Sequence, residues 1–220
     1  LINENDPIQV KQSKGLDIIL FGTKVNNHYQ IENSLDSNGY CIAHPDEITI
    51  KSQLTGSYNF DNINAAVSLG KFFSLSLEQI KEGIEAYLPA NNRSQWTNTE
   101  KNKVLLDAYN ANPSSMKAAI NAFATHEATH KTVILGDMLE LGDYATKEHQ
   151  SVIGLVKAAN FDTIILVGPL FSRTSKADGI HYFTSTLAAK KHIHNNPIEG
   201  STLLIKGSRG IALEQLLDEL

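Results

Sequence analysis

Apolar and polar side chains alternate along the first part of the chain, from about residue 16 to residue 55. Alternation of this kind is typical of β-strands with one buried face. Residues 37–39, Ser-Asn-Gly, stand between two such runs and predict the turn of a hairpin. Apolar residues then recur at helical spacing over residues 62–73, and Ser76 with Gln79 has the signature of a capping box at the start of a second helix. We therefore predict a strand-rich segment followed by two helices.

The pattern changes after residues 88–93, where proline and asparagines separate two periodic regions. Short apolar runs, of the kind buried on both faces of a sheet, then alternate with stretches of helical spacing. The predicted strands are residues 104–106, 132–135, 163–167 and 202–205, and the predicted helices begin near Pro113, Thr146, Ser185 and Ile211. This alternation specifies an α/β fold with a mostly parallel sheet covered by helices on both faces. We expect two domains, residues 1–88 and 89–220.

Composition narrows the possible classes of function. The formal net charge of -5 comes from 24 acidic and 19 basic residues without long runs, which argues against nucleic-acid binding and against a basic membrane anchor. No apolar stretch approaches the roughly 20 residues that cross a bilayer, and the first residues lack the pattern of a signal peptide. The single cysteine, Cys41, excludes an internal disulfide and a thiolate zinc site. We expect a cytoplasmic monomer with no metal ligands of its own, cut within a domain at its start.

Three polar loops follow predicted strands, at the edge of the sheet where ligands of such folds bind. They comprise residues 107–113, 136–142 and 206–210. Taken singly, each loop can be interpreted as an ordinary turn or helix start. Because the carboxyl ends of parallel strands meet at one edge, their joint placement favours a ligand site.

The last of these loops has the chemistry of an anion site. Lys206 and Arg209 flank a glycine and a serine just before a predicted helix, so cationic side chains, backbone N–H groups and a helix N-terminus can face one carboxylate or phosphate. A second polar cluster, residues 55–66, is rich in asparagine, whose amide suits the edge of an adenine ring. Asn59 or Asp61 is equally suited to a helix N-cap, and the chemistry alone favours the cap.

Residues 107–116, residues 135–142 with His149 downstream, and residues 206–209 resemble successive signatures of the Mur ligase family. The resemblance is to the branch that adds D-alanyl-D-alanine to UDP-N-acetylmuramoyl-tripeptide, and it extends over nearly the whole chain. It implies that residues up to about 88 are the end of the central ATPase domain of that family. The remaining residues would then be its C-terminal Rossmann-like domain.

The resemblance also implies a reaction. ATP phosphorylates the terminal carboxylate of the tripeptide, the amine of the dipeptide attacks the acyl phosphate, and phosphate leaves, with Mg²⁺ and cationic groups neutralising charge. By resemblance, Asn59 and Asn62 would contact the adenine, Arg93 the phosphates of ATP, and Asp107 the ribose. The implied substrate-binding residues are Tyr109, Asn110, Asn112 and Ser208, and the implied catalytic residues are Lys206 and Arg209.

Two departures from the family pattern limit this interpretation. The sister ligases that add meso-diaminopimelate carry an arginine directly after the Asn-Pro pair, whereas Ser114 stands there in this chain, which favours the dipeptide-adding branch. No Gly-x-x-x-x-Gly-Lys-Ser/Thr phosphate loop occurs, so the phosphate loop and the Mg²⁺ ligands are expected upstream and the chain alone should be inactive.

Three alternatives stay open to different degrees. The chain could belong to another Mur-type ligase, either amino-acid adding or folate polyglutamylating, or it could be an isolated, non-catalytic binding module. A nicotinamide-dependent dehydrogenase is disfavoured, because no Gly-x-Gly-x-x-Gly follows a predicted strand.

Overall fold

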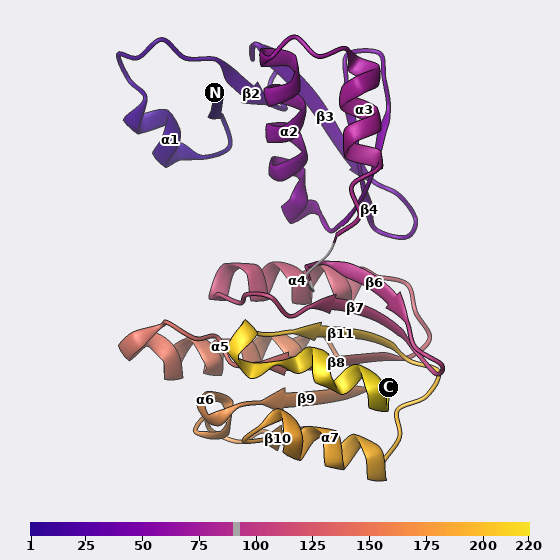
Figure 1. Ribbon diagram of the computed structural model, residues 1–220. Coiled ribbons are helices and arrows are strands. Elements are labelled where there is room, and N and C mark those ends of the chain that lie inside the picture. Colours follow the sequence, from indigo (N-terminus) through magenta and orange to yellow (C-terminus); the bar gives the residue numbers. More distant parts are fainter. Residues whose placement is uncertain (90–92) are drawn as a thin grey trace. The chain divides into compact units, whose positions relative to one another are not determined.

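The computed structural model describes residues 1–89 and 93–220, which form two compact units, Leu1–Leu88 and Pro89–Leu220. Each unit has its own sheet and its own hydrophobic core (Figure 1). Asn91 and Asn92 of the predicted junction lie outside the described residues.

The N-terminal unit is built on a sheet with the strand order β1-β2-β3-β4-β5. Its strands are β1 (Ile2–Asn3), β2 (Leu20–Gly22), β3 (Tyr29–Leu35), β4 (Tyr40–Pro45) and β5 (Ile50–Thr55). The first three pair in parallel, whereas β3, β4 and β5 pair antiparallel. The predicted hairpin is confirmed between β3 and β4, but the strand expected from residue 16 begins only at Leu20, where its pairing with Ile2 of β1 starts.

The helical segments of this unit are α1 (Pro7–Gln12), the 3₁₀ turn η1 (Ser57–Asn59), α2 (Phe60–Phe72) and α3 (Leu77–Glu85). Of these, α2 and α3 complete the core. The capping box of Ser76 and Gln79 is confirmed at the start of α3. Ile63 and Val67 of α2 and Ile80 of α3 pack with Ile31 and Ile50 of the sheet. Helix α1 was not predicted, since none of its residues is buried and its apolar pattern is correspondingly weak.

The C-terminal unit contains a sheet with the strand order β10-β9-β8-β11-β7-β6. The strands are β6 (Gln95–Asn98), β7 (Lys103–Asp107), β8 (Lys131–Gly136), β9 (Thr163–Val167), β10 (Ile180–Phe183) and β11 (Thr202–Lys206). All neighbours pair in parallel except β6, which is antiparallel to β7. The predicted mostly parallel sheet is confirmed, and the edge strands β6 and β10 are additions to it.

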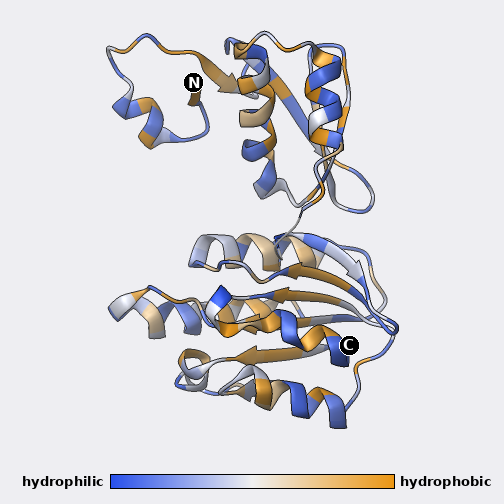
Figure 2. Cartoon of the chain, viewed as in Figure 1, coloured by the Kyte–Doolittle hydropathy of each residue, from blue (hydrophilic) through white to orange (hydrophobic). Residues whose placement is uncertain are grey.

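Helices cover both faces of this sheet (Figure 1). One face carries α4 (Pro113–Thr125), α5 (Ala145–Ala158) and α6 (Pro169–Ser172), and the other carries α7 (Thr186–Asn195) and the 3₁₀ helix η4 (Leu213–Glu219). Successive residues of β11 show the alternation: Leu204 packs in the first layer, and Leu203 and Ile205 pack in the second. The apolar colour of the central strands in Figure 2 reflects burial on both faces.

The end of the chain differs from its prediction. Instead of one α-helix from Ile211, the structure has two 3₁₀ segments, η3 (Arg209–Ile211) and η4. Ala212 between them adopts a left-handed backbone with φ of 56°, which interrupts helical hydrogen bonding. Within the described ranges, no helix is both long and apolar enough to cross a membrane.

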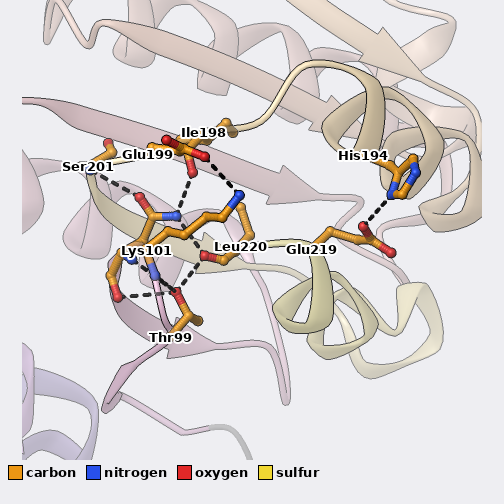
Figure 3. A network of polar contacts seen from close by, with 9 residues as sticks. Thr99, Lys101, His194, Ile198, Glu199, Ser201, Glu219 and Leu220 are labelled. Atoms are coloured by element: carbon orange, nitrogen blue, oxygen red, sulfur yellow. Dashed lines mark hydrogen bonds and ion pairs between the residues drawn. The ribbon is translucent and has the colours of Figure 1, made fainter.

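A buried polar network ties the sheet together at the edge where its parallel strands begin. The Asn102 side chain donates to the carbonyl oxygens of Ile198 and Leu220, each at 2.7 Å, and accepts from the Ser201 N–H at 3.0 Å. Thr99 also donates to Leu220, and His194 of α7 contacts Glu219 of η4 (Figure 3). These contacts join the β6–β7 turn to the start of β11 and to η4.

Candidate functional site at the carboxyl edge of the sheet

Three loops meet where β7, β8 and β11 end. Lys206, the last residue of β11, is in register with Asp107 of β7 on one side and with Leu135 of β8 on the other. The strands therefore finish at the same level, and the loops that follow them lie next to one another. This is the edge of a parallel sheet at which ligands bind.

Lys206 is held in a buried ion pair. Its side chain is 3% exposed, its ammonium Nζ lies 2.6 Å from Oδ2 of Asp107, and it also donates to the carbonyl oxygen of Asn110 at 3.2 Å. The other carboxylate oxygen of Asp107 accepts from the Ser94 N–H at 3.2 Å. The pair joins β11, β7 and the segment before β6. The positive charge of Lys206 is therefore balanced within the protein, and its implied catalytic role remains a prediction.

The two arginines of the site share one aromatic neighbour. The guanidinium carbon of Arg93 lies 3.8 Å from the ring centroid of Tyr109, and that of Arg209 lies 5.5 Å from the same centroid. Both arginines are exposed, and among the described residues of this unit neither forms an ion pair with a carboxylate. Cation–π contacts orient a guanidinium without neutralising it. The geometry therefore leaves two positive charges available to an anionic ligand.

Asn112 contributes first to local structure. It is the N-cap of α4, where its Oδ1 accepts from the Ser115 N–H and from the Ser114 hydroxyl, each at 2.8 Å, with Pro113 at the first helical position. The prediction of Asn112 as N-cap is confirmed. Asn110 is exposed on the same loop. The structure brings both residues to the site edge, while their contact with a substrate stays a prediction.

Ser208 is buried and supports a neighbouring loop. Its hydroxyl oxygen accepts from the Leu139 N–H at 3.0 Å, and its own N–H donates to the carbonyl oxygen of Asp137 at 3.1 Å. The expectation of a helix N-terminus at this loop is wrong, because only the three-residue 3₁₀ turn η3 follows Ser208. Sequence reasoning did not assign a role at this edge to Asp137, a fully buried carboxylate whose signal was its place directly after a buried strand.

The asparagines implied to contact adenine lie in the N-terminal unit, at the start of α2. Asn59 donates to the carbonyl oxygen of Thr55 at 2.8 Å, and Asn62 donates to Oδ1 of Asn59 at 2.9 Å. Asn59 is the N-cap residue of α2, as the capping alternative predicted, but its side chain makes no cap hydrogen bond and its backbone is helical, because η1 runs directly into α2. Asp61 lies within α2, where its carboxylate accepts from the Asn5 side chain.

Acidic, histidine and cysteine side chains do not gather into a metal site in the part of the chain that the structure describes, where no group of three or more could hold an ion. These residues therefore do not fit a Mg²⁺ site. The candidate anion-binding groups at this edge are the side chains of Arg93 and Arg209.

The fold and the site geometry together define an α/β domain with two exposed arginines beside Tyr109 at the carboxyl edge of its mostly parallel sheet. The chain belongs to the Mur ligase family: a family described as "Mur ligase, glutamate ligase domain" matches residues 92–209, more than half of the 220 residues.

Individual relatives agree with this membership. The chain is 28% identical over 211 residues to the UDP-N-acetylmuramoyl-tripeptide--D-alanyl-D-alanine ligase of Bacillus subtilis. The match covers 91% of this chain and 46% of that relative. It is also similar to a crystal structure of MurF from Acinetobacter baumannii, with a TM-score of 0.82, 23% identity and coverage of 100% of this chain and 51% of that one.

A third relative is the MurF ligase of Thermotoga maritima, solved in complex with ADP. It matches with a TM-score of 0.79 and 18% identity, over 98% of this chain and 51% of that one. The chain thus spans about half the length of the relatives it matches.

Proposed function

We propose that this chain is part of an ATP-dependent ligase that joins D-alanyl-D-alanine to UDP-N-acetylmuramoyl-tripeptide in the synthesis of peptidoglycan precursors. In this reaction the tripeptide carboxylate is phosphorylated by ATP. The dipeptide amine attacks the resulting acyl phosphate, the new amide bond replaces the bond from carbon to the phosphate oxygen, and phosphate and a proton are released. The C-terminal unit supplies groups that bind and orient the reacting carboxylate and the dipeptide.

The observation that carries this proposal is the two guanidinium groups beside Tyr109, which form no ion pair with a carboxylate of the described residues. Tetrahedral intermediates of acyl transfer accumulate negative charge, and preorganised cations lower the free energy of such states. Arg209 lies in the loop after β11 and Arg93 lies just before β6, and the Tyr109 ring already orients both guanidinium groups. Because arginine binds carboxylates and phosphates through two parallel hydrogen bonds, both reacting groups suit this edge.

The ATP side of the proposal rests on Asn59, Asn62, Arg93 and Asp107. The amides of Asn59 and Asn62 suit the edge of an adenine, Arg93 suits a phosphate, and the Asp107 carboxylate suits ribose hydroxyls. The relative solved with ADP supports nucleotide use by the family. Since the sequence has no phosphate loop and its described residues form no Mg²⁺ site, we place both functions in upstream residues and expect the 220-residue chain alone to be inactive.

The dipeptide-adding branch is favoured over its sisters by one position and by the relatives. Ser114 stands where the meso-diaminopimelate-adding branch has an arginine, and its hydroxyl is used in the cap of α4. Two relatives, with 28% and 33% identity, are each named UDP-N-acetylmuramoyl-tripeptide--D-alanyl-D-alanine ligase. We further propose a monomeric protein that acts in the cytoplasm.

Binding of the dipeptide can be tested on the 220-residue chain by NMR titration. D-Alanyl-D-alanine at millimolar concentration should shift the amide resonances of Asn110, Asn112 and Lys206, and L-alanyl-L-alanine should shift them less. An isolated binding module for another ligand would leave these resonances unchanged. That result would contradict the dipeptide assignment.

Ligation can be tested in a longer protein that carries this chain behind a phosphate-loop domain. Replacing Arg209 by Ala should lower kcat/KM by about 100-fold, as the loss of one charge-stabilising group typically does. Arg173→Ala is the matched control, since Arg173 is also an exposed arginine of the C-terminal unit but lies at the end of α6. Equal activity of the two variants would contradict the role of Arg209.

A further inference from the structure

The loop after β8, residues 137–141, is held by buried polar contacts with α5 and α6. Asp137 and His149 are both fully buried, and they come from this loop and from α5. Their ring and carboxylate atoms approach to 3.6 Å, between Nε2 of His149 and Oδ1 of Asp137. A buried carboxylate and a buried imidazole are costly unless their polar atoms are satisfied, so their partners identify what they hold.

Asp137 anchors the loop to α6. Its carboxylate oxygens accept from the N–H groups of Leu170 and Phe171, at 2.8 and 2.9 Å, and its own N–H donates to the carbonyl oxygen of Val167. Gly168 makes this approach possible: it has a φ of +128°, and a Cβ there would lie 2.3 Å from the carboxylate of Asp137. The start of the loop is therefore fixed at the end of β9.

His149 holds the next residue of the loop. Its Nε2 accepts from the Met138 N–H at 3.0 Å, and its Nδ1 lies 2.7 Å from the carbonyl oxygen of Ala145, one turn earlier in α5. An imidazole nitrogen that accepts a hydrogen bond carries no proton, so the proton must be on Nδ1. The ring also packs edge-on against Phe171, with 4.5 Å between the ring centroids. The hydrogen bonds with Met138 and Ala145 together specify the neutral Nδ1–H tautomer.

The loop in turn holds the Ser208 segment. The Leu139 N–H donates to the Ser208 hydroxyl, and the Ser208 N–H donates to the carbonyl oxygen of Asp137. The two backbones lie so close here that a Cβ added at Gly207 would be 3.0 Å from the Cα of Gly136. His149 and Ser208 are therefore connected through hydrogen bonds to the backbone of residues 137–139, and Arg209 follows Ser208 in the sequence.

We propose that His149 is a positioning residue: its neutral imidazole fixes the loop 137–139, and through that loop it sets the position of Ser208 and Arg209 for the incoming substrate. The effect on the incoming substrate rests on the proposed ligase function, whereas the hydrogen-bonded link from His149 to Ser208 does not. His149 touches no substrate in this role. Its effect is transmitted through residues 137–139.

The ligand-free test uses NMR on the 220-residue chain. A scalar coupling across the hydrogen bond from the Met138 amide to Nε2 of His149 is expected, together with the Nδ1–H tautomer. His149→Leu removes the acceptor, and amide exchange at Leu139 and Ser208 should become at least 10-fold faster. His149→Gln places an acceptor near the same point and should keep exchange within 3-fold of the unmodified chain.

Asn102→Leu is the control for general loss of stability, because Asn102 is buried at the opposite edge of the same sheet. Asn102→Leu should speed amide exchange at Leu139 and Ser208 no more than it speeds amide exchange at Ile165 of β9. Absence of the coupling, or exchange at Leu139 and Ser208 that is unchanged in a folded His149→Leu chain, would overturn the proposal.

The longer protein separates this proposal from the proposed function. There, His149→Leu should raise KM for the dipeptide at least 10-fold with a smaller change in kcat, and His149→Gln should restore KM to within 3-fold. An unchanged KM in His149→Leu would overturn the substrate-positioning role. No ligation by the unmodified protein would contradict the proposed function, and the coupling and exchange data would then decide the proposal on His149.

Discussion

At the scale of single residues, the site combines groups that bind with groups that support. The structure places Lys206 and Asp107 in one buried pair, although 99 residues separate them in the sequence. The sequence identified both as polar residues at strand ends, but it gave no means to see that β11 pairs with β7, which makes the two residues register partners. A lysine and an aspartate that the sequence offered as separate ligand-binding groups form an ion pair with each other.

Breaking this pair should cost stability as well as activity. We expect Lys206→Ala to lower the free energy of unfolding of the C-terminal unit by about 3–5 kcal/mol, since it leaves the Asp107 carboxylate buried and unpaired. Urea unfolding followed by circular dichroism measures the change. Lys206→Met combined with Asp107→Leu should recover most of the loss, and a single variant as stable as the unmodified chain would contradict the buried pair.

The two possible roles of Asn112 can be separated by one pair of variants. Asn112→Ala removes the cap of α4 and should cost about 1 kcal/mol of stability, whereas Asn112→Asp keeps the accepting oxygen and should be close to neutral. Thermal unfolding of the two chains measures this difference. If Asn112→Asp destabilises the chain as much as Asn112→Ala does, the capping role is wrong. If the Asn112→Asp chain binds the dipeptide as tightly as the unmodified chain, the amide N–H₂ of Asn112 is not needed for binding.

At the scale of elements, the buried central strands could be predicted from the sequence, whereas the partly exposed edge strands could not. The strands β7, β8, β9 and β11 are covered on both faces, so their apolar runs are plain in the sequence. The edge strands β6 and β10 have few buried residues and mixed polarity, as in Gln95–Asn98, and this hides them. The left-handed residue that divides the end of the chain is an alanine, which gives no sequence signal for that conformation.

The amino edge of the C-terminal sheet depends on Asn102. Replacing Asn102 by Ala removes three hydrogen bonds, leaves the Ser201 N–H without its acceptor, and should lower the free energy of unfolding by about 2–4 kcal/mol. Denaturant titration of the variant measures the loss. Ser175→Ala, an exposed change in the same unit, should stay within about 0.5 kcal/mol of the unmodified chain. Equal stability of the two variants would contradict the role of the network.

At the scale of the whole molecule, two histidines make stability depend on pH. Burial lowers the pKa of His126, and the cations of Lys103 and Lys131 lower it further; burial lowers the pKa of His192, with His181 nearby as the second cause. Both groups are neutral in the folded and the unfolded chain above pH 6.5 or so. As the pH falls below this value, the unfolded chain takes up protons first, so folding stability falls until the folded pKa values are passed.

This dependence gives a measurable outcome. The urea midpoint of the C-terminal unit should fall between about pH 7 and pH 5, and the double variant His126→Gln and His192→Gln should show a smaller fall over the same range. Buffers of equal ionic strength keep screening constant. A fall of the same size in the double variant would assign the dependence to other groups.

The groups proposed for the reaction are divided between the two units. The N-terminal unit carries the asparagines proposed for adenine, the C-terminal unit carries the arginines and the strand-end loops, and the sequence contains no phosphate loop. The family and the fold were recognisable from three ordered motifs. The supporting contacts of Lys206, Asp137 and His149 were not, because they join segments that only the folded sheet brings together.

The most direct test of the central claim is phosphate release by the longer protein that carries this chain, measured with ATP, UDP-N-acetylmuramoyl-tripeptide and D-alanyl-D-alanine, beside the 220-residue chain in the same mixture. The proposal predicts release by the longer protein only when all three substrates are present, a fall of about 100-fold in Arg209→Ala, and no release by the 220-residue chain. Release that does not require D-alanyl-D-alanine, or that occurs equally with meso-diaminopimelate in its place, would contradict it.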